Sequence, residues 1–597
     1  MTENTKIIRG SKGGDKAPPP PYRAPDTLHS RSFATIQDLI SEGEIEGFAT
    51  ASKEGLTKGT TAYNNASLKD VFLDDTPILN ATADSSNPSD TDLNFQNVTF
   101  KSKFGIPNQT AMSGIPDIDE SRAPTGVQVV VENSDGTESG GLIGAVTRQI
   151  SNTDVDAVIV TLTWPQIQIF EDNGDINGDR VDYKIQLQHD NGGFVTKIES
   201  FVEGRTADAY ARDHRIQLND SFTTVDIKVI RVTADSSTST RINAFQFTSF
   251  QEVIDNISTY PNSAYTALRF DSQQFNRIPS RKYRIRGIKV RIPGAGANNS
   301  GTPTVDNATG RIVYPSGYIF NGVMGAAVYT NCPAMCLLDL LTNTRYGLGN
   351  HIIDSNLDLF SFVAASKYSN ELVDDKTGAG TQEARFSCNV NIQSPKQAFD
   401  AINELSGVMR CMPIWSAGSV TISQDKPLTA SYVFNLANVG ETGFSYSGSS
   451  LKQRHSVVSV SYFNMDSKEI DVEVVEDATA IAKLGTIVKR VRAFACTSRG
   501  QAARLGRAIL FGEQNESEVV SFTTSIDAGI VVRPGSVIEV NDPVRSGARR
   551  GGRVVSATTT TITIDALEQT NLPDVTDNAT VSVILSDGTV EVGSISN

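Results

Sequence analysis

The sequence predicts a multidomain, β-rich α+β protein in which a minority of short helices pack on sheets. Three observations carry this prediction. The chain has 597 residues, too many for one hydrophobic core, so we expect about three to five domains. Residues from Gly126 to about Val253 read almost entirely as strands and turns, and helical patterns become frequent only from Pro333 onward.

The first 25 residues form a polar arm rich in Gly and Pro. Gly10–Gly14 is a flexible run, and Pro18–Pro21 is a stiff polyproline spacer. Such a segment cannot bury a core by itself. It is either simply disordered or a strap that becomes ordered on a neighbouring subunit.

A helix is expected to begin near Ser32, because Phe33, Ile36, Leu39 and Ile40 fall on one helical face, and Gly43 is a plausible stop. A strand is then expected over Ser67–Leu73, followed by a β-turn at Asp74–Pro77.

About seven short strands are expected between residues 126 and 255, with turn clusters at Asn173-Gly174 and Asn191–Gly193. Alternation is visible in three places, which are Val155, Ala157, Ile159 and Thr161; Tyr183, Ile185 and Leu187; and Val225, Ile227, Val229 and Arg231. This pattern predicts an inserted, β-sandwich-like module.

The second half of the chain mixes strands with four helices. Helices are expected at Pro333–Thr342 and Leu357–Leu372. A third is expected after an N-cap at Ser394 and Pro395 in the first turn, with Ala398, Ile402, Leu405 and Met409 on one face. A fourth should open at Ser498, with Gln501 completing a capping box. Residues 518–597 are rich in strands, and a small barrel is expected there.

These patterns predict six consecutive segments. They are an arm (1–25), a first segment (26–125), the inserted module (126–255), a return to the first segment (256–310), α+β domains (311–500) and a C-terminal, β-barrel-like domain (501–597).

Composition limits the function. The formal net charge of −15 argues against a dedicated nucleic-acid binder, although an acidic wall is compatible with DNA passing without sticking. The five cysteines indicate buried thiols in a reducing compartment, and Cys332 and Cys336, the only close pair, lack zinc-site partners. With no long apolar run and no signal-peptide pattern at the start, we expect the chain to be made and kept in the cytoplasm until assembly.

No catalytic pattern is recognisable. Neither a phosphate-binding GxxxxGK[ST] loop nor HExxH is present, and the five histidines (His29, His189, His214, His351, His455) are scattered. Glu171–Asp179 resembles a calcium loop, but Arg180 stands where an EF-hand needs Gly, and Gln186 where it needs Glu. An Asn- and Asp-rich hairpin turn explains it better, which leaves a loosely built calcium site open. We therefore assign no catalytic, cofactor-binding or metal residue and expect no cofactor.

Four separated stretches resemble the tip attachment, or host-specificity, proteins J of lambda-like siphophages, in their N-terminal and middle portion. The stretches are Gly10–Gly14 with Ala24–Leu28 and Asp38–Gly47; Val71–Pro77; Asn331–Ala334 with Asp339–Gly349; and Ala493–Ala502 with Pro534-Gly535. Supporting matches are Arg286–Pro293, Gln424-Asp425 and Phe444–Ser450. They occur in family order, which makes coincidence an inadequate explanation.

The resemblance implies a structural tail hub at the tail tip of the virion, and not an enzyme. It implies a homotrimer in which each chain contributes two similar hub domains. The family hub contacts distal tail and other tail-tip proteins, the tape-measure protein, and receptor-binding or fibre proteins. It closes the tube, meets the bacterial outer surface at infection, and opens for DNA, which crosses the lumen without specific binding.

Family members usually continue beyond the matched region with fibronectin-like modules and a receptor-binding end. Receptor binding is therefore assigned to no residue here. Two other functions stay open: a receptor-binding adhesin whose sandwich loops carry the site, and a cell-wall hydrolase, for which no motif is visible.

Overall fold

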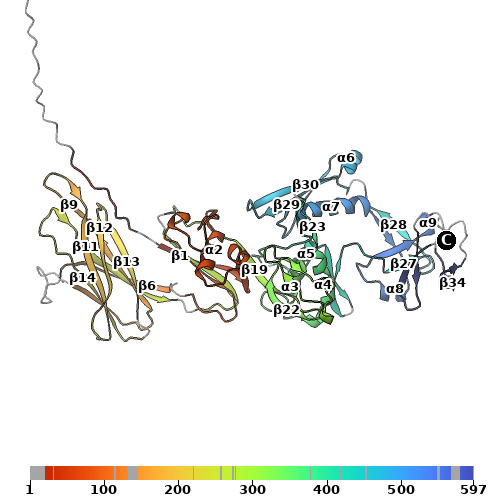
Figure 1. The fold of residues 1–597 in the computed structure, drawn as a ribbon, viewed down its shortest axis with the longest axis horizontal. Helices are drawn as coiled ribbons and strands as arrows, with labels where there is room; N and C mark the ends of the chain where they lie inside the picture. The colour runs from red at the N-terminus through yellow and green to blue at the C-terminus, as the bar shows by residue number, and fades with distance from the viewer. Residues whose placement is uncertain are drawn as a thin grey trace, which may run out of the picture. The chain divides into compact units, whose positions relative to one another are not determined.

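Strands predominate along the chain, which confirms the predicted β-rich class (Figure 1). The computed structural model describes residues 20–30, 33–112, 116–131, 145–218, 221–255, 258–271, 274–275, 277–376, 378, 380–394, 396–416, 418–450, 453–546, 551–565 and 579–595. The chain divides into a first unit, Met1–Glu44 with Thr57–Arg284, and a second unit, Ile45–Leu56 with Ile285–Asn597. The six predicted segments stay a prediction.

The first unit contains a three-stranded antiparallel sheet in the order β1 (Phe33–Glu42), β17 (Ser263–Asp271), β5 (Thr99–Phe104). The predicted helix near Ser32 was wrong, because β1 is a strand that pairs with β17 from Phe33 to Glu42. Ile36 and Ile40 are four residues apart, a spacing that suits one helical face and one strand face equally. Leu39, counted on the helical face, is 69% exposed on the opposite side of the strand.

A second small sheet has the order β18 (Arg281–Tyr283), β3 (Val71–Leu73), β4 (Thr76–Pro77). The turn at Asp74-Asp75 is present, with both residues at positive φ. The strand predicted over Ser67–Leu73 is correct only from Val71, because α2 (Thr61–Ser67) and a 3-10 turn (Leu68–Asp70) precede it. Ser67 Oγ donates a 2.8 Å hydrogen bond to the Tyr63 carbonyl, which favours the helical turn.

The region predicted to be a sandwich holds two four-stranded antiparallel sheets. One has the order β12 (Val195–Gly204), β11 (Asp179–His189), β14 (Val225–Arg231), β7 (Ala145–Ile150). The other has the order β13 (Tyr210–Gln217), β8 (Ala157–Trp164), β16 (Phe245–Asp255), β6 (Pro116–Val129). One core joins both sheets and is built around Trp164, Tyr183 and Phe245. In β8 the buried residues are Ala157, Val158, Val160, Leu162 and Trp164, whereas Ile159 and Thr161 of the predicted set are only half-buried.

The sandwich interrupts the three-stranded sheet between two paired strands. β5 and β17 are neighbours, with Phe104 opposite Ala264, although the whole sandwich lies between them in the sequence. Gln109 links the segment that enters the sandwich to the segment that leaves it. Its Oε1 accepts from Gly105 N at 3.0 Å, and its Nε2 donates to the carbonyls of Tyr260 and Ser263 at 2.5 and 2.9 Å.

The second unit begins with a segment from early in the chain. β2 (Ile45–Phe48) and α1 (Ala49–Lys53) belong to it, and its first sheet has the order β2, β19 (Ile285–Pro293), β22 (Met324–Tyr329). The helices α3 (Pro333–Thr342), α4 (Leu359–Ser369) and α5 (Ala398–Val408) contribute to one core with β19. Short pairs accompany them: β20 (Thr304–Val305) with β21 (Ile312–Val313), β23 (Leu372–Asp374) with β24 (Gln382–Ala384), and β25 (Cys411–Ser416) with β26 (Ser419–Gln424).

The predicted start of the third helix was wrong, because α5 begins at Ala398 with Gln397 at the N-cap and no side-chain cap. Pro395 lies outside the described residues. The start of α7 (Arg499–Asn515) is confirmed, since Ser498 Oγ accepts from Gln501 N at 3.2 Å. The Gln501 side chain does not complete a capping box and instead bonds the backbone of Ser387.

α7 packs on a sheet ordered β30 (Glu469–Glu476), β29 (Val457–Asn464), β31 (Val488–Arg492). The remaining strands form two-stranded pairs: β27 (Tyr432–Asn435) with β33 (Ile538–Asn541), β28 (Ser445–Gly448) with β32 (Glu518–Ser521), β34 (Val554–Ala557) with β35 (Ile562–Ile564), and β36 (Thr580–Ile584) with β37 (Val590–Ser594). Short helices are α6 (Ala478–Leu484), α8 (Ile526–Val531) and α9 (Pro543–Ser546).

The predicted C-terminal barrel is not what the described residues form. Between residues 501 and 595, the described strands make pairs of two and do not close on themselves. Alternating apolar residues specify strands but not how many strands join one sheet. The pattern therefore could not show whether these strands close into a barrel. In the described part of the chain, no helix is both long and apolar enough to cross a membrane.

The loop after α3, which carries the Tyr346–Gly349 motif, folds back over the end of the helix. Leu348 N donates to the Leu340 carbonyl at 2.9 Å, and Gly349 N to the Asn343 carbonyl at 3.0 Å. A Cβ on Gly349 would collide with the carbonyl of Thr342. Glycine is therefore required at this position by backbone packing.

We expect Gly349→Ala to destabilise the α3 region by about 1–3 kcal/mol, because the new methyl group overlaps backbone that cannot move freely. Gly407→Ala is the control, since Gly407 lies in α5 with nothing within 4 Å of an added Cβ. It should gain up to about 1 kcal/mol from helix propensity. Hydrogen exchange of the α3 and α5 amides measures both, and equal effects would refute the packing argument.

Candidate functional site: the charged cluster of the sandwich

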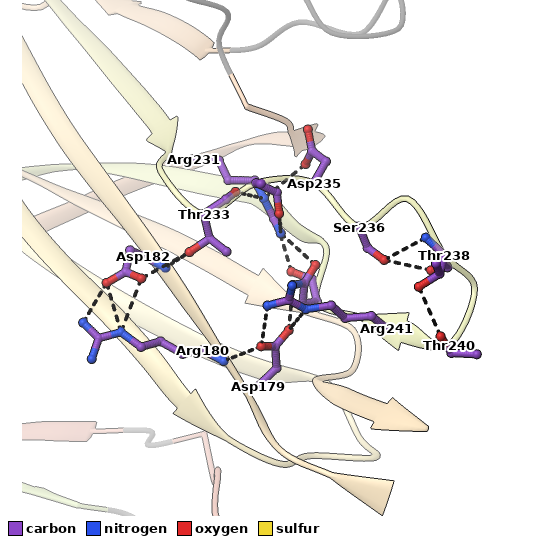
Figure 2. Close-up of polar contacts among 12 residues, drawn as sticks. Asp179, Arg180, Asp182, Arg231, Thr233, Asp235, Ser236, Thr238, Thr240 and Arg241 are labelled. Carbon is purple, nitrogen blue, oxygen red and sulfur yellow. Dashed lines mark hydrogen bonds and ion pairs between the residues drawn. The ribbon is translucent and has the colours of Figure 1, made fainter. Parts of the chain in front are cut away.

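A cluster of charged side chains joins the start of β11, the end of β14 and the loop that follows it (Figure 2). Its centre is Asp179, which is 8% exposed. The Asp179 carboxylate accepts bonds of 2.7 and 2.8 Å from Arg241 and of 2.7 Å from Asn243 Nδ2. Arg180 N donates a further bond of 2.8 Å. Both carboxylate oxygens are thus hydrogen-bonded within the fold.

Arg231 is the buried cation of the cluster, with only 2% of its surface exposed. It donates to the backbone and side-chain oxygens of Asn243 at 2.9 and 2.7 Å, and to the Thr233 carbonyl at 2.9 Å. Asp235 Oδ1 lies 3.1 Å from Arg231 Nε and supplies the opposite charge. A buried guanidinium is tolerable only when its donors are matched in this way.

The ionised state of Asp179 follows from two opposed effects. Burial raises the pKa of this carboxyl, but hydrogen bonds from Arg241, Arg180 and Asn243 lower it by more than burial raises it. The pKa of Asp179 therefore lies below its ordinary value. The carboxylate is therefore charged at neutral pH. Because Asp179, Arg241 and Asn243 satisfy one another, the cluster fastens loops and presents no free acid, base or nucleophile.

The fastened loop continues past Asp235 to the rim of the sandwich. Ser236 Oγ donates to the Thr238 carbonyl at 2.8 Å, and Thr240 Oγ1 to Thr238 Oγ1 at 3.1 Å. These residues are labelled beside the cluster in Figure 2. The result is an exposed hydroxyl-rich loop held by a buried anchor, an arrangement suited to presenting a fixed surface.

The calcium-like stretch is a hairpin, as predicted. β9 (Gln168–Phe170) precedes the stretch and pairs with β10 (Ile176–Asn177), which lies within it, and β15 (Arg241–Ile242) pairs with β9. The acidic residues of the stretch point to different partners and do not converge on one point. Asp175 accepts from Tyr22 N at 2.6 Å, whereas Asp179 faces Arg241. Among the residues with described positions, no group of three or more His, Cys, Asp or Glu side chains is arranged to hold a metal.

His214 and His455 each have a polar side-chain partner from another part of the fold. His214 Nε2 lies 2.8 Å from the Tyr183 hydroxyl in the sandwich, and His455 Nδ1 lies 2.9 Å from Glu513 Oε2 beside α7. Burial, with a contribution from Arg212, lowers the pKa of His214 to about 4. His214 is therefore neutral at physiological pH.

The cysteines are free thiols, three of them buried. Cys332 lies 3.2 Å from Ser366 Oγ, while Cys336 contacts Cys388. The neighbour Cys388 was not found from the sequence, because it lies 52 residues from Cys336 and is brought in by a backbone bond to Asn331. Burial raises the pKa of Cys411 to about 12 and of Cys496 to about 11, so these thiols are protonated at neutral pH.

Two open surface pockets lie in the second unit, with volumes of about 730 and about 570 Å³. Lys289, Arg291 and Asp354 line the first, and Arg291 donates two bonds of 2.8 Å to Asp354. Arg499 and Glu473 line the second and pair at 2.7 Å. Their paired charges make them polar surfaces to which we assign no function.

Comparison with known proteins gives two family matches. Residues 138–256 match the FNIII-A domain of tip attachment protein J, and residues 397–556 match a family described as putative phage tail protein. A tip attachment protein J of Escherichia phage SECphi4 is 30% identical over 560 residues, which is 92% of this chain and 44% of the relative. That of Escherichia phage SECphi27 is 29% identical over 542 residues, 90% of this chain and 41% of the relative. The chain thus spans less than half the length of these relatives.

Solved structures are more distant. A 43 kDa tail protein of prophage MuSo2 from Shewanella oneidensis is 11% identical, with a TM-score of 0.22 over 67% of this chain and 89% of that one. The stem and receptor-binding domain of spike protein P1 from bacteriophage PM2 is 11% identical, with a TM-score of 0.16 over 41% and 99%. At these TM-scores neither bears on the fold or the function.

We expect Asp179→Ala to destabilise the sandwich by about 1–3 kcal/mol, because Arg241 and the buried Asn243 lose their acceptor. Asp182→Ala is a control on the same strand. The Asp182 side chain is 36% exposed, and its partners are an exposed Arg180 and the Thr233 hydroxyl at 3.2 Å, so its loss should cost under about 1 kcal/mol. Hydrogen exchange of β11 and β14 amides compares the two, and equal losses would contradict the anchoring role of Asp179.

The sandwich should lose stability on acidification because of His214. The unfolded chain binds the extra proton with a pKa near 6.5 and the folded chain only near 4, so stability is full above about 6.5 and falls as the pH drops toward about 4. His214→Gln should flatten this dependence between pH 6.5 and 4. Urea unfolding of the sandwich at several pH values tests it, and an unchanged slope would rule out His214 as the source.

Proposed function

Taking as premise that this chain is a homologue of the tip attachment proteins J, we propose that it is a structural protein of a bacteriophage tail tip. The observation that carries the proposal is sequence similarity over nine-tenths of the chain. The two family matches, one in the sandwich and one in the second unit, extend it to both units.

In this proposal the chain is a hub and not an enzyme. Three copies form a ring that closes the tail tube, contacts the distal tail and tape-measure proteins, and carries receptor-binding or fibre proteins. Receptor engagement shifts the ring between two states, and DNA then passes through the lumen without specific binding. The net charge of −15 supports this last point, since an acidic wall repels phosphate. Assembly takes place in the host cytoplasm.

A saturated charge cluster also supports a structural role. Asp179 and Arg231 are hydrogen-bonded to Arg241, Asn243 and backbone oxygens. This arrangement stabilises a surface and offers no reactive group to a substrate. A hub needs surfaces of that kind, because it works by holding its neighbours in fixed positions.

A second candidate function is a receptor-binding adhesin, favoured by the position of the sandwich. The module leaves the three-stranded sheet between β5 and β17, so its removal leaves those strands able to pair. Its rim loop at 236–240 is exposed and fixed by the charge cluster. Such a loop is where a receptor contact would be found.

One genetic experiment separates the two functions. A phage with a nonsense codon in this gene is complemented by the full chain or by a chain in which a short Gly/Ser linker replaces residues 113–257. We expect no complete tails without complementation, because a hub is needed for assembly, and complete tails with either complementing chain. Electron microscopy counts the tails and adsorption assays count the particles bound to cells.

The outcomes are distinct. Complete tails in the uncomplemented phage would refute the hub proposal. Complete tails that adsorb normally with the shortened chain would exclude the sandwich as an adhesin, whereas complete tails that fail to adsorb would identify it as one. A full chain with the same linker inserted between Asn191 and Gly192, in an exposed turn, controls for the linker.

A further inference from the structure

Residues 20–30, which precede β1, lie in an extended conformation along the sandwich. Backbone bonds hold them on both sides of residue 23. Ile176 N donates to the Tyr22 carbonyl at 2.8 Å, and Ala24 N donates to the Ile176 carbonyl at 2.9 Å. Thr27 N donates to the Arg205 carbonyl at 3.0 Å. The segment therefore forms an isolated parallel bridge with β10 at Arg23 and a backbone hydrogen bond with Arg205, which directly follows β12.

Side chains add selectivity to this backbone pairing. Arg205 is 3% exposed, and its Nη1 lies 2.7 Å from both the Ala24 carbonyl and Asp26 Oδ1. Leu28 packs against the sandwich core, and Ser30 Oγ accepts from Ala211 N at 2.8 Å. The surface thus distinguishes a carboxylate, an aliphatic side chain and a hydroxyl at fixed spacing.

The sandwich surface is also shaped to receive the segment. Gly204 has φ +146°, and a Cβ there would collide with Thr27 Oγ1 and lie 3.1 Å from Leu28 Cγ. A Cβ on Gly174 would lie 3.1 Å from Pro21 Cγ. Two glycines therefore leave the space that the segment occupies, at the two ends of its contact.

Arg205 retains binding capacity under the segment. Its Nε and Nη2 are buried and have no hydrogen-bond partner in the described structure. Unmatched buried donors are costly, and they are best met by a second acceptor such as a carboxylate oxygen or a bound water. The groove is consequently a place where an extended segment with a carboxylate beside Arg205 binds more favourably than one without it.

We propose that the sandwich carries a binding groove for an extended peptide with one carboxylate and that residues 20–30 of the same chain are its ligand, held as a removable strap. The recognised features are Ala24, Asp26, Thr27 and Leu28. Most of the strap is exposed and Leu28 is its main apolar contact, so it opens more readily than the sandwich core. While bound, it gives the sandwich a third chain connection to the three-stranded sheet, besides those at Gly105 and Asn262.

A binding experiment in trans tests the groove. A chain lacking residues 1–30 is titrated with a fluorescent peptide of residues 20–30, and anisotropy measures binding. We expect saturable one-to-one binding, at least tenfold weaker for peptides with Asp26→Lys or Leu28→Asp. The full chain, whose groove is occupied, should bind the peptide at least tenfold more weakly than the truncated chain.

Failure of the peptide to bind a truncated chain that retains its β-sheet circular dichroism would overturn the proposal, as would equal binding of the three peptides. Hydrogen exchange on the full chain gives an independent check if the truncated chain does not fold. The Ala24 and Thr27 amides should be protected and should lose protection in Leu28→Asp while β11 amides keep theirs. Unprotected Ala24 and Thr27 amides in the unaltered chain would also overturn it.

Discussion

The pairing of β17 with two partners is the constraint on which the first unit depends. On one side β17 pairs with β5, which places Phe104 opposite Ala264. The sandwich is therefore an insertion between two paired strands. On the other side it holds β1 from Phe33 to Glu42. Because β1 begins at Phe33, this pairing anchors the chain shortly after the strap as well as at the base of the sandwich. A single strand thus organises elements from three distant parts of the chain.

The sequence predicted local structure well where one periodicity or one cap was decisive. The strands of the sandwich and the Ser498 cap of α7 belong to this group. It failed where residues satisfied two patterns, as Ile36 and Ile40 did in β1. The charge cluster was beyond sequence reasoning. Asp179 was noticed only in a calcium-like loop, since its partners Arg241 and Asn243 lie 62 and 64 residues away and become neighbours only through the sandwich topology.

The cluster and the strap groove use arginine in two different ways. Arg231 and Arg241 are matched by Asp235, Asp179 and Asn243, which leaves a rigid anchor. Arg205 has two unmatched donors beneath a segment with little buried area. A buried arginine whose donors are all hydrogen-bonded holds its partners in place, whereas one with unmatched donors can bind another acceptor. The same module therefore combines a fixed rim with an attachment that opens.

The crossing of Ile45–Leu56 into the second unit has a consequence for biosynthesis. Ile45 and Phe48 are 2% and 1% exposed in the folded chain, and their strand pairs with β19 through Ile288 and Ile285. These partners leave the ribosome about 240 residues later, which at typical elongation rates is on the order of 10–50 s. During that interval β19 does not yet exist for the segment Ile45–Phe48 to pair with. Pairing of Ile45–Phe48 with β19 is therefore possible only after the whole of the first unit has been synthesised.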